Sequence, residues 1–180
     1  MIRFDERIWI FCAIFCLIFP VQWWISAIIA AGVHEFYHCA AIFLLRGRIL
    51  GIRIGISGAE IETEGLTEMG EFLCALAGPL GSFSLLCVLR IFPVLSLCGL
   101  VQGCFNLLPV YPLDGGRAMV ILFRRWFPQT CEMLFSTVQT IVFSACLAAS
   151  LYGTVFLSFG WLPVILCVVG IANAWLRKKP

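Results

Sequence analysis

The sequence is poor in charge and in histidine. Only 12% of its 180 residues are charged and 62% are hydrophobic, whereas an ordinary soluble domain has about 25% charged and about 45–50% apolar residues. A soluble fold of this size could not bury so much apolar surface, which indicates that a bilayer is the solvent. The net charge of +2 gives no indication of nucleic-acid binding. We expect one membrane-embedded domain over residues 1–180.

No CxxC pair occurs among the ten cysteines. Such pairs are typical of zinc ribbons and redox motifs, and regularly spaced cysteines in a secreted chain are typical of disulfide frameworks. Most of these cysteines lie instead inside apolar runs, where free cysteine behaves as a small hydrophobic residue. We therefore expect reduced, buried thiols.

Long apolar runs divide the chain into six expected spanning helices, because a span requires about 20 apolar residues. The first run, residues 8–45, is too long for one span, and Pro20 followed by Trp23 and Trp24 marks a break near the membrane surface. A later run is interrupted by prolines, glycines and polar residues. The expected helices are 8–20, 22–45, 71–89, 94–123 with a break at 106–116, 131–151 and 154–176.

The positions of the basic residues support this count. Six spans with both termini in the cytosol place eleven of the twelve lysines and arginines on one side of the membrane, with Arg90 on the other. Cytosolic loops are enriched in lysine and arginine. We therefore predict an integral, multi-pass membrane protein with cytosolic N- and C-termini.

Residues 46–70 differ from the apolar runs. Segment 49–56 is rich in β-branched residues and glycine, residues 57–58 are turn formers, and glutamates then alternate with Ile61 and Thr63. A period of two on both sides of a turn predicts a β-hairpin, with an irregular cytosolic loop as the alternative. The expected fold class is an all-α polytopic membrane protein of six helices, with a small membrane-associated β-hairpin between helices two and three.

Both histidines of the chain lie in one short motif. His34 and His38 enclose Glu35 in the HExxH sequence of residues 34–38, late in the second expected helix. Residues four apart share a helix face, so both imidazoles can bind one zinc ion while the carboxylate takes a proton from an activated water. The alternative is a chance histidine pair. An ionisable residue at membrane depth costs at least about 2.5 kcal/mol, however, so three such groups in an apolar helix indicate a function.

A catalytic zinc needs a third protein ligand, which must be a carboxylate because the chain has no other histidine. Most candidate carboxylates lie at the N-terminus, in the polar connecting segment or at the start of the fifth helix: Asp5, Glu6, Glu60, Glu62, Glu64, Glu68, Glu71 and Glu132. Asp114 lies instead inside an apolar run. Asp114 lies ten residues before Arg124, or about 15 Å along a helix, and His38 lies about 12 Å before Arg46. Asp114 and His38 are therefore expected at similar depth in the membrane, below the basic residues at one membrane surface.

The backbone around Asp114 is expected to be irregular. Pro109 and Pro112 stop a regular helix just before it, and the glycines of residues 115–116 are expected to let the backbone turn tightly after it. Irregular backbone at membrane depth is tolerated only where protein or a watery cavity surrounds it, as at a metal site. The alternative is a polar kink in which Asp114 pairs with Arg117.

Three segments resemble the site-2 protease family of intramembrane zinc metalloproteases. They are residues 34–38 (HEFYH), 77–79 (AGP) and 106–116 (NLLPVYPLDGG). Their order and spacing are similar to those of the branch that contains stage IV sporulation protein FB. Small residues in the second segment also allow close approach of helices, and its proline bends the helix.

The resemblance implies a six-helix metalloprotease with Zn2+ bound by His34, His38 and Asp114. It also implies Glu35 as the catalytic base and Asn106 as a residue that positions the substrate strand. The expected reaction is hydrolysis of peptide bonds in membrane-embedded or membrane-adjacent protein substrates, in a bacterial cell membrane. The expected partners are such a substrate and the lipid bilayer, with a regulatory membrane partner left open and no nucleic acid.

Two other classes of function remain open. A metalloprotease of the prenyl-protein type also uses HExxH, but with a glutamate as third ligand, for which Glu132 is the candidate here. A non-proteolytic membrane zinc-binding protein or zinc transporter is the other alternative. Transport usually needs polar residues along a path through several helices, whereas the polar residues here converge on one region. A serine protease of the rhomboid type is not expected, because no histidine remains to activate a serine.

Overall fold

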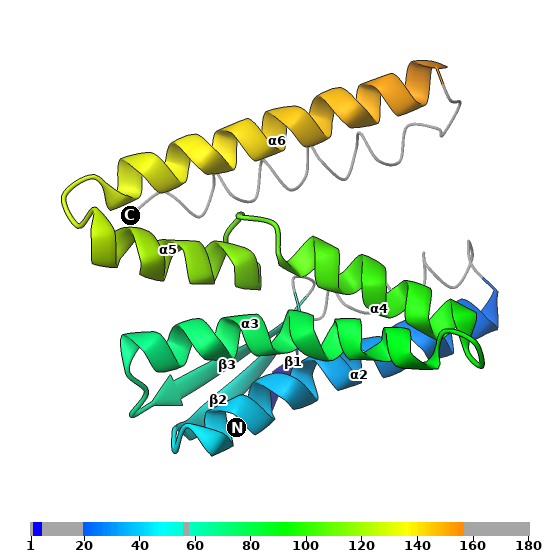
Figure 1. Cartoon of the computed structure of the whole chain (residues 1–180), viewed down its shortest axis with the longest axis horizontal. Helices are drawn as coiled ribbons and strands as arrows, with labels where there is room; N and C mark the ends of the chain where they lie inside the picture. The colour runs from blue at the N-terminus through cyan, green and yellow to red at the C-terminus, as the bar shows by residue number, and fades with distance from the viewer. Residues whose placement is uncertain (1, 5–19, 56–57, 157–180) are drawn as a thin grey trace.

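The computed structural model describes residues 2–4, 20–55 and 58–156, which are mostly helical with a small sheet (Figure 1). The helices are α2 (Val21–Leu44), α3 (Glu68–Ser84), α4 (Pro93–Asn106), α5 (Asp114–Trp126) and α6 (Cys131–Phe156), with a 3-10 turn η1 (Leu85–Val88) after α3. The strands are β1 (Ile2–Phe4), β2 (Arg48–Gly55) and β3 (Gly58–Glu64).

Three described helices are long and apolar enough to cross a membrane: Val21–Leu44, Glu68–Val88 and Cys131–Val155. They correspond to the second, third and fifth predicted helices. The fourth predicted helix is also helical on both sides of its predicted break, as α4 and α5. The first predicted helix, 8–20, and nearly all of the sixth, 154–176, lie outside the described residues.

The predicted boundary between the fifth and sixth helices is wrong. Instead of ending at residue 151, α6 continues without a break to Phe156, where the described segment ends. No proline interrupts this stretch, and the single Gly153 costs only about 1 kcal/mol inside a helix. The hydroxyl of Thr154 donates to the carbonyl of Ser150 one turn earlier (2.8 Å), as expected within a continuous helix.

The predicted β-hairpin is present, and a third strand joins it. β2 and β3 pair antiparallel, with Arg48 opposite Glu64 and Gly55 opposite Gly58. β1 pairs in parallel with β2. It was not predicted, because a strand of three residues is too short to produce a recognisable period-two pattern. In the strand order β1-β2-β3, β3 lies at an edge of the sheet as described.

Helices α2, α3 and α4 pack together next to the sheet, and small residues let them approach closely (Figure 1). A Cβ on Gly99 of α4 would lie 2.6 Å from the backbone carbonyl oxygen of Ser82 in α3. A Cβ on Gly103, one turn later, would lie 2.7 Å from the ring of Phe83. The predicted close approach at the small residues of α3 is also present, since a Cβ on Gly78 would overlap a side chain of α2. α6 lies against α5 and apart from this group (Figure 1).

The helix is interrupted between α4 and α5, as predicted from the prolines. The predicted role of the glycines of residues 115–116, a tight turn after Asp114, is wrong. Both lie in the first turn of α5 rather than in a turn after Asp114. A Cβ on Gly115 would overlap the carbonyl oxygen of Leu107, and one on Gly116 would lie 2.5 Å from the carbonyl carbon of Val110. The glycines therefore allow the connecting loop to cross the start of α5.

Candidate metal centre

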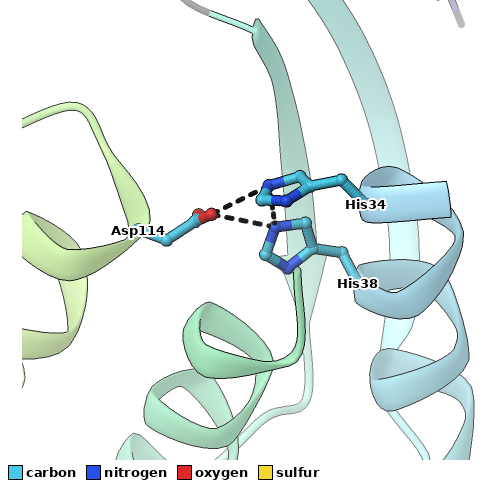
Figure 2. Close-up of side chains that lie close together, drawn as sticks. All are labelled: His34, His38 and Asp114. Carbon is cyan, nitrogen blue, oxygen red and sulfur yellow. Dashed lines mark hydrogen bonds and ion pairs between the residues drawn. The ribbon is translucent and has the colours of Figure 1, made fainter. Parts of the chain in front are cut away.

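α2 carries both histidines on one face. His34 and His38 lie one helical turn apart, and both rings point toward the start of α5 (Figure 2). Only 3% of His34 and 9% of His38 is exposed. The rings meet edge to face with their centroids 4.8 Å apart. The structure thus brings the two imidazoles together, as their spacing predicts.

Asp114 is the first residue of α5 and approaches the rings from the opposite side (Figure 2). It is 6% exposed. Its Oδ2 lies 3.0 Å from Nε2 of His34 and 3.2 Å from Nε2 of His38. The two Nε2 atoms are themselves 3.2 Å apart. The three side chains singled out as metal ligands therefore form one buried cluster.

The triangle of ligand atoms fits a tetrahedral zinc ion. With bonds to zinc of about 2.0–2.2 Å, two ligand atoms of a tetrahedral site lie about 3.3 Å apart. The three separations in the cluster, 3.0, 3.2 and 3.2 Å, are close to this value. Among the side chains that the structure describes, no other group of histidine, cysteine and acidic residues is placed to hold a metal ion.

The outer nitrogens of both rings have hydrogen-bond partners on α3. Nδ1 of His38 lies 2.7 Å from the carbonyl oxygen of Cys74. A carbonyl only accepts, so this nitrogen donates, and Nε2 of the neutral ring directs a lone pair into the cluster. Nδ1 of His34 lies 2.9 Å from Oγ of the buried Ser82, which can accept in the same way. Three electron-pair donors then face one another, an arrangement that a cation stabilises.

One face of α3 forms the surroundings of the cluster. Cys74, Gly78 and Ser82 follow one another at intervals of four residues, so they share a helix face. A Cβ on Gly78 would overlap Nε2 of His38 and lie 2.7 Å from Nε2 of His34. Glycine at this position therefore keeps the space next to both ligand nitrogens open. Ser82 was not predicted as part of the site, and Gly78 was predicted only to allow close packing of helices. The signal that could have found them is the spacing of small residues on this face.

The two other residues implied by the family resemblance lie outside the cluster of ligand atoms. Glu35 follows His34 in α2 and is half-buried, with its Oε2 shielded from solvent. Asn106 is the last residue of α4, and its side-chain amide donates to the carbonyl of Gln102 (3.2 Å). Glu35 is therefore the neighbour of a candidate ligand along α2, and Asn106 lies at the start of the loop that leads to Asp114.

The alternative carboxylates do not join the cluster. Four are exposed, namely Glu64, Glu68, Glu71 and Glu132. The side chains of Glu60 and Glu62 lie outside the described part of the structure, as do Asp5 and Glu6. The predicted alternative of an ion pair between Asp114 and Arg117 is also not observed, since the side chains close to the Asp114 carboxylate in the described part of the chain are His34 and His38.

A cavity of about 240 Å³ lies beside the cluster and reaches the sheet. Its lining includes the ligand His38, Ile61 and Thr63 of the edge strand β3, and Tyr111 of the loop before α5. The cavity therefore borders a strand edge and a candidate metal ligand at once. An extended peptide chain could lie along the strand and reach the ligands.

The chain is similar to a known protein in its fold, but not detectably in its sequence. No protein-family model matches the chain, and no curated protein sequence matches it. Among solved structures, the site-2 protease from Methanocaldococcus jannaschii is similar, with a TM-score of 0.67 and 21% sequence identity. The similarity covers 99% of this chain and 91% of that one. The chain therefore shares the fold of a site-2 protease along almost its whole length.

Proposed function

We propose that this protein is an intramembrane zinc metalloprotease of the site-2 type, which hydrolyses peptide bonds of substrates within or beside the membrane. The observation that carries this proposal is the convergence of two buried imidazoles and one buried carboxylate on a single point, between helices of a chain that has the fold of a site-2 protease. The motif spacing favours the branch that contains stage IV sporulation protein FB, and with it a bacterial cell membrane.

His34, His38 and Asp114 would hold the zinc ion and leave one coordination position open, as in catalytic zinc sites. When bound, zinc would supply a Lewis acid that polarises the substrate carbonyl and acidifies a water molecule. Glu35 takes the proton from the attacking water and returns it to the leaving amine, which is the role of a general base and acid. The hydrogen bonds from α3 hold the rings in the orientation that this chemistry requires.

The substrate must enter as an extended chain, because a helical backbone keeps its carbonyls in its own hydrogen bonds. β3 lies at an edge of the sheet and lines the cavity next to His38. A substrate segment that adds to this edge would exchange backbone hydrogen bonds with it. Asn106 is then the proposed partner of the substrate strand on the side of α4. Six spans and cytosolic termini, as predicted from the charges, complete the proposed topology.

Two substitutions test the mechanism. Glu35→Gln should keep zinc and abolish cleavage, because only the proton acceptor is removed, whereas Asp114→Ala should lose both zinc and cleavage. The experiment co-expresses each variant with a panel of membrane-anchored candidate substrates, scores product bands and measures zinc in the purified protein by atomic absorption. Glu132→Ala, at an exposed carboxylate of α6, is the control that should keep both.

The outcomes separate the alternative functions. Retained proteolysis in Glu35→Gln would refute the mechanism. Zinc that persists in Asp114→Ala and disappears in Glu132→Ala would favour the prenyl-protein type of protease. Zinc transport has less support, because the described residues contain one candidate metal-binding group rather than a series along a path.

A further inference from the structure

The cavity beside His38 has charged side chains in its lining. Two arginines of α5, Arg117 and Arg124, and one carboxylate of α3, Glu71, contribute to it. Much of the remaining lining is aliphatic, from residues such as Ile42 and Val120. The arginines are seven residues apart, two helical turns, and so lie on one face of α5.

The cavity arginines have no carboxylate at ion-pair distance among the described side chains. Arg117 is only partly exposed. A guanidinium with five donors next to aliphatic side chains favours a carboxylate partner, which it can bind with two parallel hydrogen bonds. Glu71 lines the same cavity without pairing to either arginine, so two arginines and one carboxylate are the charged groups among the described lining residues.

The other lining residues of this cavity indicate which molecule would occupy it. His38, a candidate zinc ligand, and Thr63 of the edge strand line the same space. A peptide strand that adds to β3 beside Thr63 would run along this lining toward His38. A lipid headgroup could reach an arginine at the rim, but it has no reason to extend along a strand edge toward the ligands.

On the basis of the proposed proteolytic function, we propose that Arg117 and Arg124 form a subsite for acidic side chains of the substrate. Along α5, Arg117 is about 4.5 Å and Arg124 about 15 Å from Asp114. An extended peptide advances about 3.3 Å per residue. Arg117 then faces a substrate residue one or two positions from the scissile bond, and Arg124 one at four or five positions. The substrate class is a membrane protein segment with aspartate or glutamate in this window on one side of the cleaved bond.

A binding experiment tests the subsite without requiring cleavage. The probes are two eight-residue peptides of alternating valine and threonine, one with a single aspartate and one with asparagine at the same position. They are titrated against zinc-loaded Glu35→Gln protein in nanodiscs of phosphatidylcholine. The aspartate peptide should bind about tenfold tighter or more, because a charge-assisted hydrogen bond replaces a neutral one. Arg117→Gln should bring the ratio of the two affinities close to one.

Arg125 provides the matched control, since it is a neighbouring arginine of α5 that does not line the cavity. Arg125→Gln should keep the preference for the aspartate peptide. Equal binding of the two peptides, or a preference that survives both Arg117→Gln and Arg124→Gln, would overturn the proposal. Competition by phosphatidylglycerol that depends on Arg117, without discrimination between the peptides, would identify the cavity as a headgroup site and also overturn it.

Cleavage gives a second, separate readout. Wild-type protein digests a peptide library in detergent, and the cut positions are read by mass spectrometry. Acidic residues should be enriched within about five positions on one side of the cut, in keeping with the spacing along α5. The enrichment should disappear in the Arg117→Gln, Arg124→Gln double variant, whose zinc content is unchanged. No cleavage by wild type counts against the proposed function, whereas cleavage without this enrichment counts against the subsite alone.

Discussion

α3 and α6 are both apolar helices long enough to span a membrane, yet they use their surfaces in opposite ways. In the apolar 18-residue core of the span formed by α3 and η1, 39% of the residues are buried, whereas in the corresponding core of α6 none are. α3 lies between α2, α4 and α5, and α6 lies to one side against α5 (Figure 1). Hydropathy therefore identifies both helices equally well, but only burial distinguishes a helix that surrounds the candidate site from one whose apolar surface is exposed.

The side chains of the two helices show the same difference. α3 buries small residues, among them Gly78 and Ser82 next to the histidines. α6 exposes larger ones, such as Ile141 and Leu151. In a bilayer an apolar side chain gains little by leaving the lipid, so close packing and hydrogen bonds decide which helices associate. We therefore expect that small changes in α3 have large effects, and that large changes in α6 have small effects.

The largest expected effect comes from adding one methyl group to α3. Gly78→Ala places a Cβ against Nε2 of both histidines, where the metal would bind. Purified Gly78→Ala should contain little or no zinc and should not cleave, which metal analysis and a product assay would measure. Gly32→Ala in α2 is the control, because a Cβ there meets nothing within 4 Å. A full zinc content in Gly78→Ala would contradict this assignment of the open space.

A smaller effect is expected from Ser82→Ala. The substitution removes the hydrogen-bond partner of Nδ1 of His34 and leaves the ligand atoms in place. Loss of such a supporting hydrogen bond typically weakens metal affinity by about 10- to 100-fold, which a competing chelator can measure. Ser96→Ala is the matched control, since Ser96 is equally buried but donates to the carbonyl of Leu85. The expectation fails if both variants bind zinc as wild type does.

The packing of α3 against α4 is tested by Gly99→Ala. The new Cβ would lie 2.6 Å from the carbonyl oxygen of Ser82, so the helices must separate slightly. We expect a loss of about 1–3 kcal/mol in stability, the usual cost of overpacking, seen as a lower thermal unfolding midpoint in detergent. The neighbouring Val101 is 61% exposed, and Val101→Ala should leave the midpoint nearly unchanged. An unchanged midpoint in Gly99→Ala would mean that the two helices do not need this close approach.

The smallest effect is expected in α6. Ile141 is 62% exposed, so Ile141→Ala should change stability by no more than about 0.5 kcal/mol and should leave zinc binding and cleavage as in wild type. The same thermal and product assays apply. A loss comparable with that of Gly99→Ala would show that this face of α6 binds another protein surface instead of lipid.

Much of the fold and part of the site could be predicted because the signals are local. The i,i+4 spacing of His34 and His38, the prolines before Asp114 and the alternation along residues 58–64 each lie within a few residues. They predicted a helix with two histidines on one face, a broken helix and a hairpin, and the structure has all three. The three-residue β1 and the continuation of α6 past residue 151 were missed, because no strong local pattern marks either.

By itself, the sequence determined that the protein belongs in a membrane, that two imidazoles share a helix face, and that a carboxylate inside an apolar run is the candidate third ligand. Only the tertiary structure decided that Asp114 meets rings 76 and 80 residues away, and that α3 supplies the partners of both. It alone revealed Gly78 as the residue that keeps the metal position open. The reason is physical: helix periodicity is set by nearest neighbours along the chain, whereas a metal site depends on which faces of distant helices pack together.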